Sequence, residues 1–121
     1  MFSFERLSVY KKAQDQNLRI IKFLSSEKSI DPFMMDQLKR ASLSIILNIA
    51  EGNGRERKGD RGYFLTVSRS SVFECVAILD VLRNLNKITE DNYSELYVYY
   101  EEISKMLIGL KKKISEFKSY S

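Results

Sequence analysis

The 121 residues suit a single domain, and charged residues (30%) and hydrophobic residues (44%) occur in proportions typical of a folded globular protein. This composition excludes a disordered chain, and the beginning, MFSFERLSVYKK, has no apolar run that would predict secretion or membrane insertion. Cys75 is the only cysteine, which excludes an internal disulfide and favours a reducing, cytoplasmic location. The formal net charge of +4 permits contact with nucleic acid without requiring it.

The spacing of apolar residues predicts helices along almost the whole chain, and no stretch shows the alternation of a strand. We therefore expect an all-α fold, with one domain over residues 1–121. The first predicted helix covers about residues 8–26. Its expected core residues share one face of that helix: Tyr10, Ala13, Asn17, Ile20, Ile21 and Leu24.

The second predicted helix covers about residues 32–54. It begins where Asp31 precedes Pro32, because aspartate favours the N-cap and proline the first helical position. It ends at the glycines of EGNG. Its expected core residues are Met34, Leu38, Ala41, Ile45 and Ile49.

Two further helices are predicted, over about residues 60–86 and 89–118, with Thr89 as the cap of the last one. The third should bury Phe64, Val67, Ser71, Cys75, Ile78, Leu82 and Leu85. The fourth should bury Leu96, Tyr100, Ile103, Leu107, Leu110, Ile114 and Phe117. Four helices with short connections favour an up-down-up-down four-helix bundle.

The second helix carries more apolar residues than its core stripe needs. An additional apolar arc usually marks a contact between proteins, so we expect a homo-oligomer. Deep burial of this helix between its neighbours is an equally consistent alternative. Two tyrosines outside the core stripe of the fourth helix fit the same interface, although they are also suited to stacking on bases. The interface residues expected on these grounds are Leu43, Ile46, Leu47, Ala50, Tyr97 and Tyr99.

A row of polar residues lies beside the core stripe of the second helix. Glu74 falls near the core of the third helix, where a buried carboxylate needs a partner such as Arg40 or Asn48. We therefore expect a buried or interfacial hydrogen-bonded network, with simple solvent exposure as the alternative. Its members would be Gln37, Arg40, Asn48, Glu51 and Glu74, next to Ser44 and Arg55.

The stretches QLKRASLSIILNIAEGNGR and YFLTVSRSSVFECVAIL resemble a bacterial four-helix bundle family named for proteins encoded in intervening sequences of 23S rRNA genes. The matching residues are Gln37, Arg40, Ala41, Asn48, Ala50, Glu51, Gly52, Ser71 and Glu74, whereas Ser70 replaces the usual glycine. The resemblance implies a ring-shaped pentamer. It also implies similarity to accessory proteins of diversity-generating retroelements, which bind nucleic acid and a reverse transcriptase. The family name does not establish any association with the ribosome.

Basic residues suggest where nucleic acid would bind. One set, on the first helix opposite its core stripe, is Lys11, Lys12, Arg19 and Lys22, and a second set, in the following connection, is Arg55, Arg57, Lys58 and Arg61. The leading hypothesis is an oligomeric scaffold that binds structured RNA through phosphate contacts. One alternative is that these basic residues only improve solubility. We expect this role for Lys111, Lys112 and Lys113. A second alternative is an adaptor that docks another protein, such as a reverse transcriptase.

Catalysis is not expected, because the sequence contains no histidine. This excludes Ser-His and Cys-His sites and the histidine ligands of di-iron bundles. GNGRERKG follows a helix and lacks the Gly-Lys-Ser/Thr ending of a phosphate-binding loop. We therefore expect no catalytic residue, no metal site and no cofactor.

Overall fold

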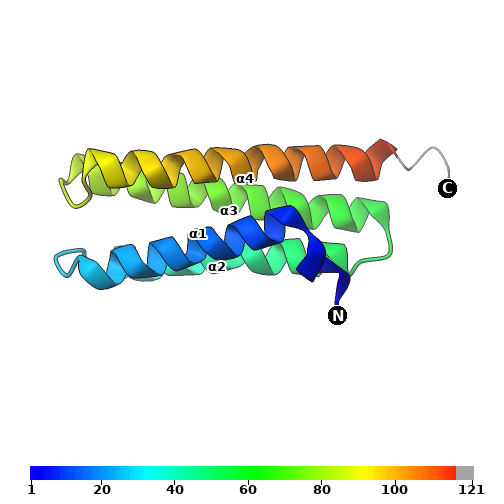
Figure 1. Cartoon of the computed structure of the whole chain (residues 1–121), viewed down its shortest axis with the longest axis horizontal. Coiled ribbons are helices and arrows are strands. Elements are labelled where there is room, and N and C mark those ends of the chain that lie inside the picture. The colour runs from blue at the N-terminus through cyan, green and yellow to red at the C-terminus, as the bar shows by residue number, and fades with distance from the viewer. Residues whose placement is uncertain (117–121) are drawn as a thin grey trace.

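The computed structural model describes residues 1–116, which form a short 3-10 helix, η1 (Ser3–Arg6), and four long helices: α1 (Ser8–Ser26), α2 (Pro32–Asn53), α3 (Lys58–Asn84) and α4 (Glu90–Glu116). The all-α prediction is confirmed, since these residues include no strand. The long helices lie lengthwise beside one another, and the α2–α3 connection is at the opposite end from the other two connections (Figure 1).

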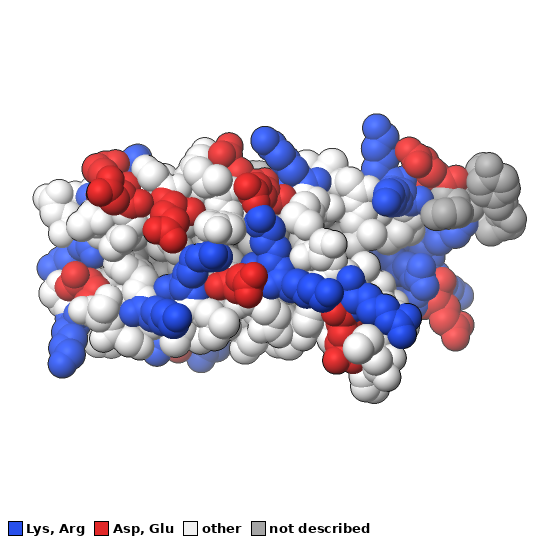
Figure 2. Space-filling view, viewed as in Figure 1, with Lys and Arg blue, Asp and Glu red and all other residues white. Residues whose placement is uncertain are grey.

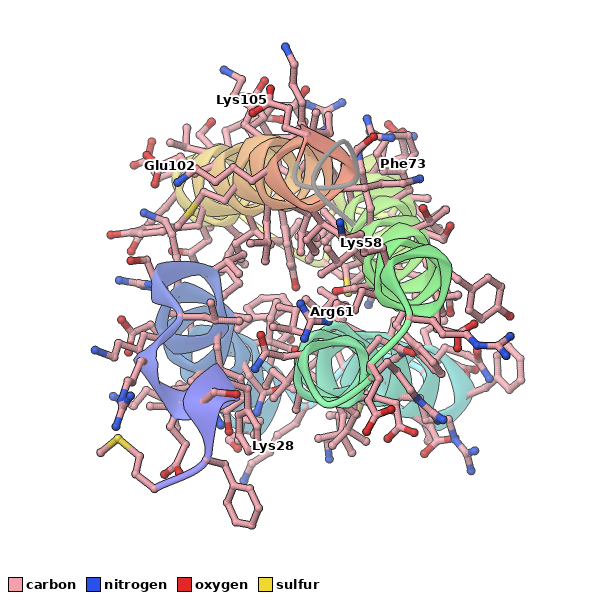
Figure 3. All side chains as sticks on the ribbon, turned by 90° about the vertical axis from the view of Figure 1, so that its right-hand side faces the viewer. Lys28, Lys58, Arg61, Phe73, Glu102 and Lys105 are labelled. Atoms are coloured by element: carbon pink, nitrogen blue, oxygen red, sulfur yellow. The ribbon has the colours of Figure 1, made fainter. Side chains whose placement is uncertain are left out.

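Each long helix packs against the next one in the chain, and α4 closes the bundle against α1 (Figures 1 and 3). The largest helix contact joins α2 and α3. Charged side chains of both signs are distributed over the face of the bundle shown in Figure 2. No helix among residues 1–116 combines the length and the apolar character needed to cross a membrane.

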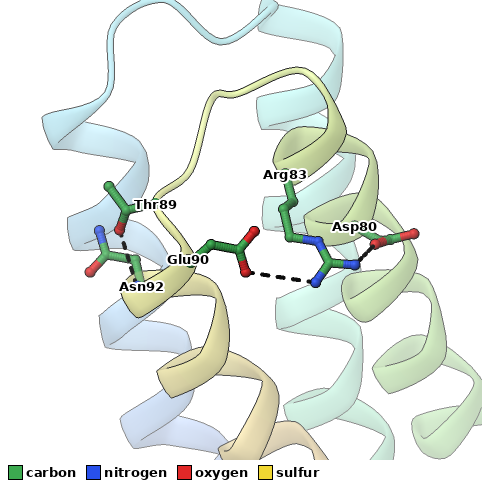
Figure 4. Close-up of polar contacts among 5 residues, drawn as sticks. All are labelled: Asp80, Arg83, Thr89, Glu90 and Asn92. Atoms are coloured by element: carbon green, nitrogen blue, oxygen red, sulfur yellow. Dashed lines mark hydrogen bonds and ion pairs between the residues drawn. The ribbon is translucent and has the colours of Figure 1, made fainter.

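Two of the long helices, α2 and α4, begin at residues whose side chains accept hydrogen bonds from their first backbone N–H groups. The Asp31 carboxylate accepts a hydrogen bond from the Phe33 backbone N–H at 2.8 Å, and Pro32 occupies the first helical position, as the sequence predicts. The Thr89 hydroxyl accepts from the Asn92 backbone N–H at 3.1 Å, directly before α4 (Figure 4). Oxygen atoms of short side chains therefore cap the N-terminal ends of α2 and α4.

A tight turn joins α3 to α4. Asn86 has a φ of 57°, in the left-handed region that asparagine tolerates better than most residues. The N–H of the next residue, Lys87, then donates to the Leu82 carbonyl at 2.8 Å. The Arg83 guanidinium donates to Asp80 at 2.7 Å and lies 3.9 Å from Glu90 of α4 (Figure 4). The turn thus holds the two helices in antiparallel contact.

Most of the expected core positions are buried. Those that are buried are Ala13, Ile20, Leu24, Leu38, Ala41, Ile45, Ile49, Ser71, Cys75, Leu82, Leu96, Tyr100, Ile103 and Leu107. Others are only partly buried: Tyr10, Asn17, Met34, Phe64, Val67, Ile78, Leu110 and Ile114. Phe117 lies outside the described residues.

The predictions for Ile21 and Leu85 were wrong, since both side chains are exposed. The actual buried arcs of α1 and α3 also include Val9, Gln16, Leu65, Ser68, Val72 and Leu79. A helix packed between two neighbours buries a wide arc, whereas the prediction assumed a narrow stripe. On α3 the buried arc extends toward α4 as well as α2. Leu85 follows Asn84, the last residue of α3, so it lies in the turn and not on the buried arc of the helix.

One buried polar side chain from each long helix meets in the bundle interior: Gln16, Ser42, Cys75 and Tyr100. We call this group the polar layer. Gln16 Nε2 donates to the Leu96 carbonyl at 2.8 Å. Ser42, Cys75 and Gln16 surround the Tyr100 hydroxyl, and burial is the main reason that the pKa of Tyr100 lies well above its usual value. Among the described residues, the Tyr100 hydroxyl has no well-aligned hydrogen-bond partner.

Burial in the polar layer should make Cys75 unreactive in the native state. Burial raises the pKa of the Cys75 thiol to about 12, with a smaller contribution from the nearby Glu74 charge, while the neighbouring Tyr100 hydroxyl opposes the shift. Since the thiolate is the nucleophile, an aromatic disulfide reagent near neutral pH is expected to label the unfolded chain only. Equally fast labelling of the native and the denatured protein would contradict this placement.

Replacing Gly52 or Gly109, which both lie in helices, by alanine should have opposite effects on the stability of the fold. A Cβ on Gly52 would lie 2.9 Å from Phe64 Cβ and 3.3 Å from the Arg61 carbonyl oxygen, whereas a Cβ on Gly109 meets nothing within 4 Å. Gly109→Ala is expected to stabilise the fold by about 1 kcal/mol through helix propensity. In Gly52→Ala, overpacking should destabilise the fold by about 1–3 kcal/mol, which outweighs the gain in helix propensity. Thermal unfolding measures both variants, and a higher melting temperature for Gly52→Ala would refute the close contact.

Candidate nucleic-acid interface

The basic arc predicted on α1 is divided in the structure. Lys12 forms an ion pair with Glu102 of α4, and Arg19 lies 3.9 Å from Glu95. The guanidinium of Arg19 also lies 3.7 Å from the ring centroid of Tyr99. These contacts correct the prediction that Lys12 and Arg19 point away from the bundle; only Lys11 and Lys22 remain on the open surface.

The physical reason is the orientation of α1. Its buried face is centred on Ala13, Gln16 and Ile20, so residues one position earlier fall on the flank that faces α4. There the acidic beginning of α4 neutralises them. Tyr99, predicted for an interface between proteins, instead packs within the chain against Lys12 and Arg19, while Tyr97 remains on the surface.

Charge is strongly segregated along α4. Residues 90–104 contain five acidic residues and no basic one, whereas residues 105–116 contain four lysines and one glutamate. On the face shown in Figure 2, acidic side chains gather over the first part of α4, and basic ones follow α1 and gather toward the end with the α2–α3 connection. The two halves of α4 therefore carry opposite charge.

The second half of α4 lies at the same end of the bundle as the α2–α3 connection (Figures 1 and 3). This arrangement brings together seven basic side chains, which we call the basic end: Arg55, Arg57, Lys58, Arg61, Lys111, Lys112 and Lys113. Residues 51–61 and 111–116, which contain these seven, also contain the acidic residues Glu51, Glu56, Asp60 and Glu116, so the two ranges together carry a formal charge of +3, compared with +4 for the whole chain. Most of the net charge is thus located at one end.

Several of these basic side chains are held by contacts with neighbouring residues of the chain. Arg61 Nε donates to the Arg55 carbonyl at 2.6 Å, and Lys111 Nζ donates to Thr66 Oγ1 at 2.7 Å. The Arg55 guanidinium pairs with Glu51 and lies 4.8 Å from the Phe64 ring centroid. Beside this framework, Arg57, Lys112 and Lys113 are exposed. In the basic end, contacts within the chain therefore hold Arg55, Arg61 and Lys111, whereas Arg57, Lys112 and Lys113 face solvent.

The network expected around Glu74 does not form within the chain. Glu74 is exposed, and Arg40 pairs with Asp36 on its own helix at 2.7 Å. Asn48 Nδ2 donates to the Ser44 carbonyl at 2.8 Å, and Glu51 pairs with Arg55. Gln37 is partly buried. The prediction of a buried Arg40–Glu74 or Asn48–Glu74 pair was wrong because Glu74 turns to the outer flank of α3.

These side chains lie along the outer junction of α2 and α3. The hydroxyls of Ser44 and Ser71 are hydrogen-bonded at 2.8 Å across the junction. Leu47 and Glu74 each follow one of these serines by three residues, so they flank this bond on the surface. We call Leu43, Ser44, Leu47, Ser71 and Glu74 the α2/α3 face.

The apolar arc predicted on α2 is partly an exposed surface. Leu43 and Leu47 are exposed, as a surface arc requires, and Ala50 is half-buried. Ile46 is only 4% exposed, so its assignment to an interface between proteins was wrong. It faces the α1 side of the core, next to Ser42, because α2 is packed from two sides.

Comparison with known proteins supports the fold over most of the chain. Residues 5–109 match the family model described as 23S rRNA-intervening sequence protein. A crystal structure of a protein of unknown function from the S23 ribosomal protein family of Bacteroides thetaiotaomicron is similar, with a TM-score of 0.79 and 28% identity, covering 86% of this chain and 98% of that one. No curated protein sequence matches the chain. The expected relation to retroelement accessory proteins stays a prediction.

Proposed function

The chain belongs to the 23S rRNA-intervening sequence protein family, and from this premise we propose that it is a non-enzymatic, oligomeric scaffold that binds structured RNA through the basic end. The observation that carries the proposal is the segregation of charge. Seven basic side chains from two distant segments gather at the end opposite the acidic beginning of α4. A polyanion would therefore favour this end over the acidic beginning of α4.

Phosphate contacts suit this surface better than base readout. Arg57, Lys112 and Lys113 are exposed and carry long cationic side chains, which suit contacts with phosphate oxygens. Such contacts depend on the geometry of the backbone of a folded RNA, and they release counterions. The expected binding is therefore sensitive to salt and tolerant of sequence.

A salt series tests the proposal. The dissociation constant of a blunt RNA hairpin is measured by fluorescence anisotropy at increasing potassium chloride concentrations. If about four phosphates are neutralised, the logarithm of the association constant should fall with the logarithm of salt with a slope of roughly −3. Absence of binding at low salt would refute the proposed function.

The α2/α3 face supports assembly of several copies. Leu43 and Leu47 lie four residues apart, so they form one exposed apolar ridge, and Glu74 and Arg40 provide charged groups near it. A contact through this face would cover the ridge. In a homo-oligomer each copy contributes one basic end, and several weak phosphate contacts then add to a higher avidity. Five copies are expected from the family resemblance.

Two leucines with equal exposure allow a matched test of this assembly. Leu47 on the α2/α3 face and Leu18 on α1 are both 55% exposed. Leu47→Glu is expected to lower the mass measured by light scattering to that of one chain, because a carboxylate would be desolvated in the contact. Leu18→Glu should leave the mass unchanged. A wild-type protein that is already monomeric, or a Leu47→Glu variant with the wild-type mass, would remove the α2/α3 face from the proposal.

A further inference from the structure

A groove runs along the outside of the α3–α4 junction, away from the α2/α3 face, and residues of the core contribute to its lining. It has a volume of about 710 Å³, with Val72 and Tyr100 among its lining residues. A second hollow of about 530 Å³ shares Arg69 and Phe73 with it and continues to Lys112 of the basic end. The groove thus connects an aromatic region with the surface proposed to hold RNA.

Two aromatic side chains present their rings to this groove. Phe73 of α3 is 57% exposed and Tyr97 of α4 is 37% exposed, although large aromatic side chains gain free energy by leaving water. The Tyr97 ring lies 5.8 Å from the Tyr93 ring, at an angle of 31°. The two exposed rings belong to facing helices, so a flat apolar group that enters the groove meets aromatic surface from both.

A cation is held beside these rings. Arg69 Nε donates to Ser104 Oγ at 3.0 Å, a bond that links α3 to α4, and its guanidinium lies 4.8 Å from the Phe73 ring centroid. Lys105 also lines the groove, on the α4 side (Figure 3). Of the two acidic residues in the lining, Asp80 and Glu101, Asp80 is already paired with Arg83. The two connected hollows together are lined by four basic residues, Arg69, Lys105, Lys111 and Lys112, against these two acidic ones, so positive charge predominates along them.

We infer that the α3/α4 groove binds unpaired nucleotides that adjoin a structured RNA held at the basic end. Bases stack on exposed aromatic rings regardless of sequence, while Arg69 and Lys105 are placed to contact the phosphates between them. An amphipathic helix of another protein would also cover the rings, but Arg69 beside Phe73 and the excess of basic residues along the two hollows favour a polyanion. The inference rests on the proposed function, since the basic end supplies the adjoining contact.

The test compares two RNA hairpins with the same stem, one blunt and one with a short 3′ uridine overhang. Wild-type protein is expected to bind the overhang hairpin about tenfold more tightly, because stacking one or two bases gives a gain of that order. The double variant Phe73→Leu/Tyr97→Leu should lose this tenfold difference and keep the affinity for the blunt hairpin. Phe33→Leu, at another highly exposed aromatic residue on α2, should retain the difference.

The outcomes separate the inference from the proposed function. Equal binding of both hairpins by the wild type would overturn the inference that the groove binds nucleotides, and would leave the proposal of RNA binding at the basic end intact. An overhang preference that survives in the double variant would also overturn it. If neither hairpin binds, the proposed function fails and the groove inference fails with it. A lower mass of the double variant in light scattering would show that a second copy covers the groove, which overturns nucleotide binding there.

Discussion

Replacing Arg57, Lys112 and Lys113 together by glutamate is expected to weaken binding of a blunt RNA hairpin by about 100-fold at moderate salt. These three side chains are the exposed part of the basic end, so their loss should not disturb the bundle. Each charge-assisted phosphate contact contributes on the order of 1 kcal/mol net, and three contacts correspond to about two powers of ten in the dissociation constant. Fluorescence anisotropy measures the change directly.

A matched control separates position from total charge. Lys22, Lys28 and Lys39 are exposed near the α1–α2 connection, at the opposite end of the bundle. Their replacement by glutamate gives the same net charge as the first variant, because each set reverses three cations. Affinity should change only slightly, as long-range attraction is screened at moderate salt. An equal loss of affinity in both variants would show that binding follows net charge and has no preferred end.

Tyr100→Ala is expected to destabilise the protein by about 3–5 kcal/mol, which corresponds to a fall in melting temperature of roughly 10–20 °C. Tyr100 is fully buried, and its ring fills the middle of the bundle between the other members of the polar layer. Removing the ring leaves a cavity that long, packed helices can close only in part. Thermal and urea unfolding followed by circular dichroism measure the loss.

Tyr100→Phe should behave very differently, with a change within about 1 kcal/mol. The Tyr100 hydroxyl is buried without a well-aligned hydrogen bond, so its removal costs little and relieves desolvation. The Phe variant thus isolates the hydroxyl from the ring. A loss in Tyr100→Phe as large as in Tyr100→Ala would mean that hydrogen bonding in the polar layer, rather than packing, anchors the four helices.

Local signals made the helix boundaries predictable. Asp31 and Thr89 place a side-chain oxygen where a helix leaves N–H groups unsatisfied, a requirement that depends only on nearby residues.

The width of each buried arc depends on how many neighbours a helix has. This is why Ile46 appeared to belong to an outer surface, although it is buried within the bundle.

The candidate site depended on contacts that sequence spacing does not reveal. The partners of Lys12 and Arg19 are Glu102 and Glu95, which lie on a distant helix, so the spacing within α1 could not show that these charges are neutralised. Conversely, Lys111 was expected to serve only solubility when α4 was considered alone. The antiparallel packing of α3 and α4 places it beside Thr66 and the α2–α3 connection. The change of charge along α4 was the signal in the sequence that indicated this.

Lysine footprinting is the most direct test of where RNA binds. Wild-type protein is acetylated briefly with and without a blunt RNA hairpin, and mass spectrometry measures the modification at each lysine. The account predicts that RNA protects Lys112 and Lys113 and leaves Lys22, Lys28 and Lys39 as reactive as in the free protein. Protection of Lys22, Lys28 and Lys39 with unchanged reactivity of Lys112 and Lys113 would contradict the basic end as the RNA-binding surface.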